Sequence, residues 1–316
     1  MLVRAQRLVT AEEWCASRAL PSTPVNDSWV LVSSQHGIAY CQLEKTGSST
    51  MLTFLLEING QRTKFRSNDD LHHTASRLFK QLGDDRVLLA HRLFSYVQVR
   101  HPFTRLVSCY CGKVLEKRLA FVLMFRNFSR LRDRRTEDIV KLEIPQYRFS
   151  RDAQGISSFT IISPPGKENF MTKFTDLDLP MDGSMPSFRE FAVEVAVEIL
   201  KCGTNQTCRT AVHASYGRQV DHCDPCEWSF DFLMKIETIG EDFPLLRRLV
   251  GHPKLQDSEA GPTIEAASEE RRVNGRIAEC RSTEHYLLQL SSVELDLVYT
   301  AFYEDFQMFG YEPFVF

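Results

Sequence analysis

Residues 41–50, C-Q-L-E-K-T-G-S-S-T, join an apolar run to a helical pattern and concentrate groups that bind anions. The residues concerned are Lys45, Thr46, Gly47, Ser48, Ser49 and Thr50. Free N–H groups and the helix dipole favour negative charge at a helix amino terminus, so we expect a phosphate-like group here. The order differs from a Walker A loop, because the lysine precedes the glycine. The alternative is structural, with Ser49 capping the helix and Lys45 solvated.

A second pair of residues, Arg100 and Ser108, could grip one phosphate from two sides. Arg100 ends the apolar run Y-V-Q-V-R, and Ser108 lies eight residues later, inside the helix expected after Pro102. Arginine offers a planar fork of donors and serine a neutral donor. Arg105, one turn before Ser108, is either a second phosphate contact or a structural residue. For the motif as a whole, the alternative is a helix start with an ordinary surface arginine.

Four of the nine cysteines crowd into one segment, at Cys202, Cys208, Cys223 and Cys226. N-x-[ST] triplets occur at Asn26, Asn127 and Asn205, and the last lies between Cys202 and Cys208. A cysteine cluster beside such a triplet fits an oxidising lumen, so we predict disulfides without assigning their pairing. A zinc site is the alternative, since Cys223-x2-Cys226 has ligand spacing, although Cys202-x5-Cys208 is a poor second pair.

The elements that must position these residues alternate between strand and helix. Strand patterns occupy residues 29–34, 37–43, 86–91, 96–100, 158–163 and 228–239. Helical patterns occupy residues 51–58, 102–119, 187–202 and 291–310. This alternation predicts an α/β fold with a P-loop-like parallel sheet flanked by helices, and such sheets bind ligands at the carboxyl ends of their strands. We expect residues 1–28 to be a leader or stalk and residues 29–316 to form a single domain.

The net charge limits the class of partner. With 38 Lys and Arg against 41 Asp and Glu among 316 residues, the formal charge is −3, which gives no reason to expect a nucleic-acid partner. The basic stretch 113–135 would suit an anionic glycan, or it is a solvated basic surface. The amino terminus has neither the apolar length of a membrane helix nor the apolar core of a signal peptide.

Taken together, the motifs resemble the Golgi carbohydrate sulfotransferases, above all the branch of chondroitin and dermatan 4-O-sulfotransferases and HNK-1-type enzymes. Residues 38–50 are similar to the family's loop for the 5′-phosphosulfate of PAPS, although Glu44 stands in place of a proline. V-R-H-P-F-T-R-L-V-S-C-Y, residues 99–110, matches its 3′-phosphate motif. Residues 222–237 resemble its C-x-P-C segment and residues 302–311 its closing aromatic motif. The resemblance covers residues 36–316.

The resemblance implies the PAPS-dependent sulfotransferase fold and transfer of a sulfuryl group from PAPS to a glycan hydroxyl, with the GalNAc 4-O position of chondroitin or dermatan favoured. Lys45, helped by the N–H groups of residues 47–50, would stabilise the leaving phosphate, and no metal is required. Arg100 and Ser108 would hold the 3′-phosphate. His91, which closes the strand at residues 86–91, is the favoured general base.

For several other residues we expect the following roles. His72, His73 and His213 are alternative bases, while His101 points elsewhere. Asp231, Lys235 and Glu237 are expected to be scaffold.

The implied compartment is the Golgi lumen or membrane; family members are membrane-anchored, but no anchor is seen in this chain. Two other functions stay open. One is a PAP- or glycan-binding homologue with weakened catalysis, which Glu44 favours. The other is a P-loop kinase or NTPase, which the missing G-x4-G-K-[ST] and the lack of a Mg²⁺-binding aspartate at a strand end disfavour.

Overall fold

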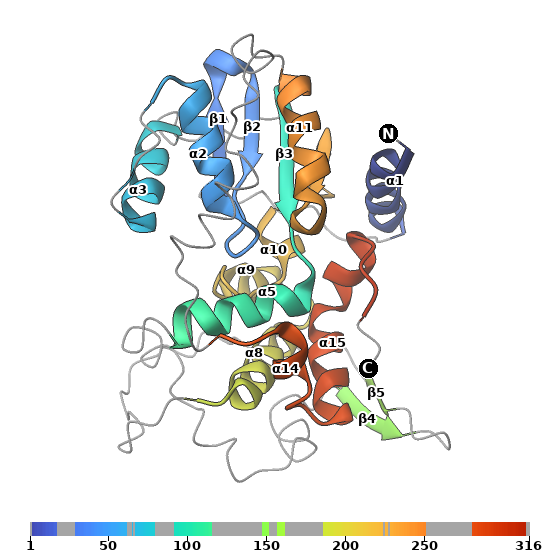
Figure 1. Ribbon diagram of the computed structural model, residues 1–316. Coiled ribbons are helices and arrows are strands. Elements are labelled where there is room, and N and C mark those ends of the chain that lie inside the picture. The colour runs from blue at the N-terminus through green and yellow to red at the C-terminus, as the bar shows by residue number, and fades with distance from the viewer. Residues whose placement is uncertain are drawn as a thin grey trace. The chain divides into compact units, whose positions relative to one another are not determined.

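Figure 1 shows the computed structural model of the chain. It describes residues 2–17, 29–61, 65, 67–79, 92–115, 147–151, 157–161, 186–223, 225–226, 228–250 and 280–313. The chain divides into two compact units. The first contains residues 1–101, 222–276 and 307–311, and the second contains residues 102–221, 277–306 and 312–316.

The first unit is built on a four-stranded sheet with the order β1-β2-β3-β6. The strands are β1 (Val30–Ser33), β2 (Ile38–Cys41), β3 (Phe94–Val99) and β6 (Phe232–Lys235). β2, β3 and β6 run parallel, and β1 joins β2 antiparallel at one edge. The predicted α/β fold with a mainly parallel sheet is confirmed, and the carboxyl ends of three strands meet at one edge. The strand predicted at residues 86–91 lies outside the described residues.

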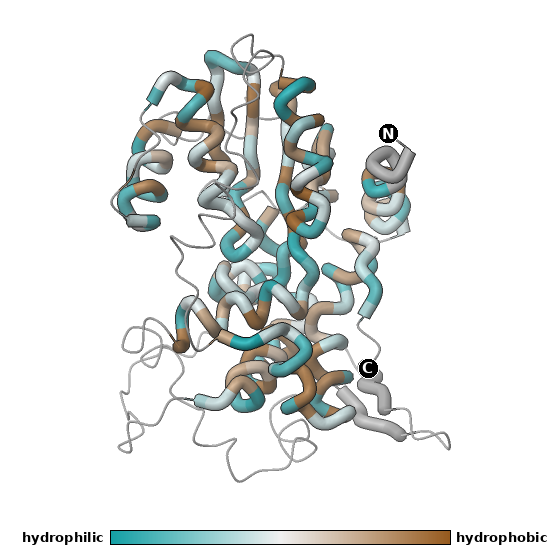
Figure 2. The backbone as a smooth tube through the Cα atoms, in the orientation of Figure 1, coloured by the Kyte–Doolittle hydropathy of each residue, from teal (hydrophilic) through white to brown (hydrophobic). Residues whose placement is uncertain are grey.

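Helices α2 (Ser48–Ile58), α3 (Asn68–Phe79) and α11 (Ile239–Val250) share one apolar core with the sheet (Figures 1 and 2). Tyr40 of β2 and Tyr96 of β3 stack within this core, with ring centroids 4.9 Å apart. α2 ends at Ile58, as the helical pattern predicted, and Asn59 is its C-cap. Gly60 follows with a φ of 67°, which glycine adopts at little cost.

Two predicted boundaries differ from the structure. The helix predicted at residues 51–58 begins three residues earlier, at Ser48. The strand predicted at residues 228–239 is confined to β6, and a 3-10 turn (η4, Ile236–Thr238) and α11 follow it. The hydroxyl of Thr238 donates to Asp242 at 2.6 Å, which favours the helical turn where the apolar alternation suggested a strand.

The predicted leader contains helix α1 (Leu2–Ala16), which has fixed partners in the first unit. A disulfide joins Cys15 to Cys226, and the Arg7 guanidinium lies 2.7 Å from the buried Asp242 carboxylate. In the part of the chain that the structure describes, no helix is both long and apolar enough to cross a bilayer.

The described residues of the second unit are mainly helical. This unit contains α5 (Pro102–Cys109), a π-helical turn (Tyr110–Leu115), α8 (Phe188–Cys202), α9 (Gln206–Ala211), α14 (Thr283–Leu287) and most of α15 (Ser292–Met308), with an antiparallel hairpin of β4 (Tyr147–Arg151) and β5 (Ser157–Ile161). Ser187 and Glu190 form a capping box at the start of α8. The helices predicted at residues 187–202 and 291–310 and the strand near residue 158 are confirmed.

The predicted disulfides are confirmed. The bonds join Cys15 to Cys226, Cys41 to Cys223, Cys111 to Cys280 and Cys202 to Cys208. The zinc alternative is therefore wrong, because Cys223 and Cys226 are bonded to cysteines outside the predicted cluster.

Asp305 of α15 holds the start of α10 (Gln219–Cys223), the helix that leads into the C-x-P-C segment. Its buried carboxylate accepts the backbone N–H groups of Gln219 and Val220 at 2.9 and 3.0 Å. Burial raises the pKa of Asp305 from 3.8 to about 6, although these two N–H groups act in the opposite direction.

We predict that Asp305→Asn changes the pH dependence of stability. Because the folded state raises this pKa, the contribution of Asp305 is fully present below about pH 4 and is lost as the pH rises to about 6. The free energy of unfolding of the wild type relative to the variant should therefore fall across that interval. Urea unfolding at a series of pH values measures it, and a difference that does not vary with pH would contradict the assignment.

Candidate functional site

The loop between β2 and α2 places a helix amino terminus at the carboxyl edge of the sheet. Gly47 is the N-cap of α2, with a φ of 92° and no side-chain cap. Ser49 is therefore inside the first turn and does not cap the helix, in contrast to the structural alternative. The N–H groups of Ser48 and Ser49 belong to the turn that has no carbonyl partner within the helix, so they suit an anion. The hydroxyl of Thr46 donates to the Leu43 carbonyl at 2.9 Å and closes the loop.

Lys45 has a left-handed backbone with a φ of 67°, and no other non-glycine residue of the described chain has a positive φ. This conformation costs about 1–2 kcal/mol for a residue with a Cβ. The Arg100 guanidinium donates to the Lys45 carbonyl oxygen across 3.2 Å. The two cationic residues predicted to anchor a ligand are thus adjacent in the first unit, at the ends of neighbouring strands.

Gln98 lies under this loop and was not identified from the sequence. It is fully buried on β3, two residues from Tyr96 and so on the same face of the sheet. Its amide oxygen and nitrogen have no hydrogen-bond partner among the described residues. A Cβ on Gly47 would lie 3.0 Å from the Gln98 amide nitrogen and 2.8 Å from Cδ1 of Ile236. The Gln98 amide therefore lies against Gly47, where a larger residue would not fit. A polar residue inside the run Y-V-Q-V was the only sequence signal.

His72 is the histidine that lies against the loop. Its Nδ1 is 3.0 Å from the amide nitrogen of Gln42, and its Nε2 is 3.5 Å from the Ser49 hydroxyl. Because an amide nitrogen only donates, this contact assigns the proton of neutral His72 to Nε2, which then faces Ser49 as a donor. The geometry gives His72 a role in positioning Ser49.

The other candidate bases lie elsewhere or are not described. His91, the favoured base, lies outside the described residues. His73 is exposed on α3. His213 belongs to the second unit, where its ring stacks on Tyr216 with centroids 5.5 Å apart.

Glu237 fixes the ends of β3 and of the closing motif. Its carboxylate accepts the backbone N–H of His101 at 2.8 Å and the hydroxyl of Tyr311 at 2.9 Å. Lys235 donates to the Gly310 carbonyl at 3.0 Å, and its ammonium lies 3.9 Å from the centre of the Tyr311 ring. These contacts are those of scaffold residues.

Burial and neighbouring charges shift the pKa values of Lys235 and Tyr311. Burial, and then the charge of Arg7, lower the pKa of Lys235 to about 8. Burial and the neighbouring Glu237 raise the pKa of Tyr311 well above its ordinary value, against the effect of Arg7 and Arg100. Tyr311 therefore stays protonated, and its hydroxyl donates a hydrogen bond to Glu237.

Asp231 is likewise held by the sheet. Its carboxylate accepts the backbone N–H of Ser95 at 2.7 Å, at the start of β3 and away from the carboxyl edge.

Arg105 and Ser108 lie on α5 in the second unit. Arg105 is buried, and its guanidinium donates to the Gly217 carbonyl at 2.6 Å and to the Ala214 carbonyl. Of the two roles left open by the sequence, this geometry favours the structural one. Ser108 is half-buried, and its contact with a phosphate stays a prediction.

The edge of the first unit thus combines two cationic residues, the N–H groups of a helix end and a buried neutral amide. These are groups that stabilise a bound anion and the negative charge that develops on a leaving group. Gln98 fits an anionic ligand at the loop, since such a ligand would supply an acceptor for the buried amide nitrogen.

Comparison with known proteins finds matches along most of the chain. The model of the sulfotransferase family matches residues 29–312. Carbohydrate sulfotransferase 8 of Mus musculus is 25% identical over 331 residues, covering 98% of this chain, and the chain spans 63% of the length of that relative. Carbohydrate sulfotransferase 10 of Homo sapiens is 24% identical over 327 residues, covering 98% of this chain and 76% of the relative. No solved structure matches the chain significantly.

We predict that Gln98→Leu stabilises the protein in the absence of ligand. Leucine has a similar volume and removes two buried polar atoms, so the free energy of unfolding should rise by about 1–3 kcal/mol. Urea unfolding measures this change. Gln98→Glu is the matched control, since it keeps the shape, adds a charge to a buried position and should lower stability. Equal stability of Gln98→Leu and the wild type would show that the amide is already satisfied.

Proposed function

The chain belongs to the sulfotransferase family, and from that premise we propose that it transfers a sulfuryl group from PAPS to a hydroxyl of a glycan. The contact between Arg100 and the Lys45 carbonyl is the observation that carries the proposal. It brings the loop resembling a 5′-phosphosulfate site and the arginine of the 3′-phosphate motif to one edge of one sheet. One nucleotide with a phosphate at each position could then engage both.

In this proposal the donor is held by the residues of the carboxyl edge. Lys45 and the N–H groups of Ser48 and Ser49 take the 5′-phosphosulfate, and Arg100 takes the 3′-phosphate. The Gln98 amide adds a neutral donor beneath the loop. Ser108 keeps the role predicted from the sequence, as a second donor to the 3′-phosphate.

The reaction is an in-line displacement at sulfur. A bond forms between the acceptor oxygen and sulfur, the bond from sulfur to the 5′-phosphate oxygen breaks, and the acceptor proton passes to a base. Lys45 and the helix amino terminus offset the charge that grows on the leaving oxygen, an effect worth several kcal/mol at comparable sites. His91 keeps its predicted role as that base, and His72 orients Ser49.

The relatives and the disulfides support the acceptor and the compartment that we propose. The relatives are named as carbohydrate sulfotransferases, so we propose a glycan acceptor, with the GalNAc 4-O position of chondroitin or dermatan favoured by the sequence resemblance. Disulfides persist in oxidising compartments, which agrees with a Golgi lumenal enzyme.

We predict that Lys45→Ala and Arg100→Ala each lower sulfate transfer by about 100-fold or more. Arg100→Ala should also weaken the thermal shift that PAP produces, because it removes a ligand contact and the support of the Lys45 carbonyl. The measurement is transfer of labelled sulfate from PAPS to chondroitin, dermatan, heparan and glucuronyl-terminated acceptors.

Arg77→Ala is the matched control, since Arg77 is an exposed cation on α3 and should leave transfer unchanged. Transfer retained in both Lys45→Ala and Arg100→Ala would refute the site.

A protein that binds the nucleotide without catalysis is the second candidate, and the acidic Glu44 beside Lys45 is the observation that favours it. A PAP-dependent thermal shift without transfer to any acceptor would support this candidate. A shift produced by ATP and not by PAP would instead support a kinase or NTPase.

A further inference from the structure

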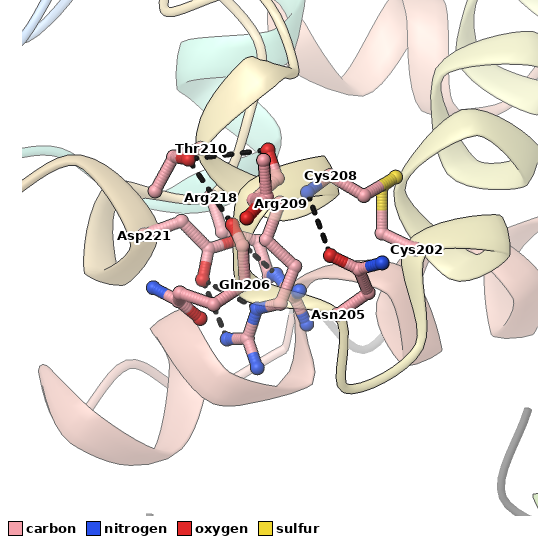
Figure 3. The surroundings of a disulfide bond; sticks show 9 residues. Cys202, Asn205, Gln206, Cys208, Arg209, Thr210, Arg218 and Asp221 are labelled. Carbon is pink, nitrogen blue, oxygen red and sulfur yellow. Dashed lines mark hydrogen bonds and ion pairs between the residues drawn. A yellow bond between two sulfur atoms is a disulfide. The ribbon is translucent and has the colours of Figure 1, made fainter. Parts of the chain in front are cut away.

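The disulfide between Cys202 and Cys208, six positions apart, closes a short loop that contains the triplet Asn205-Gln206-Thr207 (Figure 3). This triplet has the N-x-[ST] pattern that accepts N-linked glycans. Of the three such triplets in the chain, it alone lies within the described residues. Asn205 and Thr207 are both exposed, so the two side chains that define the pattern face solvent.

The hydrogen bonding of Asn205 is compatible with modification. Asn205 is the N-cap of α9, and its side-chain oxygen accepts the backbone N–H of Cys208 at 3.1 Å (Figure 3). A glycan attaches to the amide nitrogen and leaves the oxygen as an acceptor. The cap that begins α9 therefore survives glycosylation, and the modification demands no refolding of the loop.

The opposite side of α9 is fixed by buried charges. Arg209 is buried and donates to Asp221 at 2.8 Å, and it also pairs with Glu304. Arg218 donates to the other oxygen of Asp221 at 2.7 Å. Within the second unit, α9 therefore has one anchored face and one solvated face, and the triplet belongs to the solvated end. A bulky substituent there displaces none of these contacts.

We propose that Asn205 carries an N-linked glycan. In the reaction, a bond forms between the Asn205 amide nitrogen and the anomeric carbon of an oligosaccharide, and the bond from that carbon to a polyprenyl diphosphate breaks. The diphosphate leaves with the bonding electrons, and the amide gives up one proton. The donor is a lipid-linked oligosaccharide and the catalyst an oligosaccharyltransferase. The proposal rests on the proposed function only for its lumenal compartment.

The test uses the full chain expressed into the secretory pathway of a eukaryotic cell, in a background in which Asn26→Gln and Asn127→Gln leave Asn205 as the one acceptor. Treatment with a peptide N-glycosidase should shift the band by one glycan and convert Asn205 to aspartate in its peptide. Thr207→Ser keeps the pattern and should retain the shift. Thr207→Ala should lose it while leaving the Asn205 cap in place.

Asn205→Asp provides a second variant without the acceptor nitrogen but with the capping oxygen. Secreted protein of this variant should lack the shift. An unshifted parent band with an unmodified Asn205 peptide would overturn the proposal, as would a shift that persists in Thr207→Ala. Because none of these readouts is sulfate transfer, failure of the glycan and failure of the enzyme are distinguishable.

Discussion

The hydrogen bond from Arg100 to the Lys45 carbonyl is the interaction on which the shape of the candidate site depends. It joins the ends of two neighbouring strands and stabilises a left-handed lysine, a conformation that costs about 1–2 kcal/mol. A hydrogen bond from a charged donor contributes about 1.5–3 kcal/mol, which is enough to offset that cost. Two residues after Lys45 the loop reaches Gly47, the N-cap of α2. Arg100 therefore shapes the loop as well as adding charge to it.

Several residues of the sequence motifs in this chain form hydrogen bonds that fix the backbone. Glu237 accepts the N–H of His101 and the hydroxyl of Tyr311, so it ties the end of β3 to a residue from the carboxyl terminus. Asp305 accepts the N–H groups of Gln219 and Val220 and so fixes the start of α10. Both residues lie in segments that resemble family motifs, and both act on N–H or O–H donors within the protein. A residue in one of these motifs can therefore have a structural role and need not contact a ligand.

The sequence was sufficient wherever structure is decided locally. The extent of α8, the end of α2 at Ile58 and the strand-to-helix loop at Lys45 depend on residues within one or two turns, and these predictions were correct. The extent of β6 was wrong because the Thr238–Asp242 hydrogen bond, and not side-chain alternation, decides where the strand ends. The disulfide pairs could not be assigned, since Cys41 and Cys223 are separated by 182 positions and Cys15 and Cys226 by 211.

Arg105 and Gln98 show the limit of inference from side-chain type. A guanidinium in a phosphate motif can bind a phosphate or two backbone carbonyls with the same donors, and only the folded partners, Gly217 and Ala214, distinguish these uses. Gln98 is the opposite case, because a glutamine in an apolar strand predicts a buried partner that the described residues do not supply. Burying such a group lowers stability, and the anion that we propose at this loop would give the amide nitrogen an acceptor.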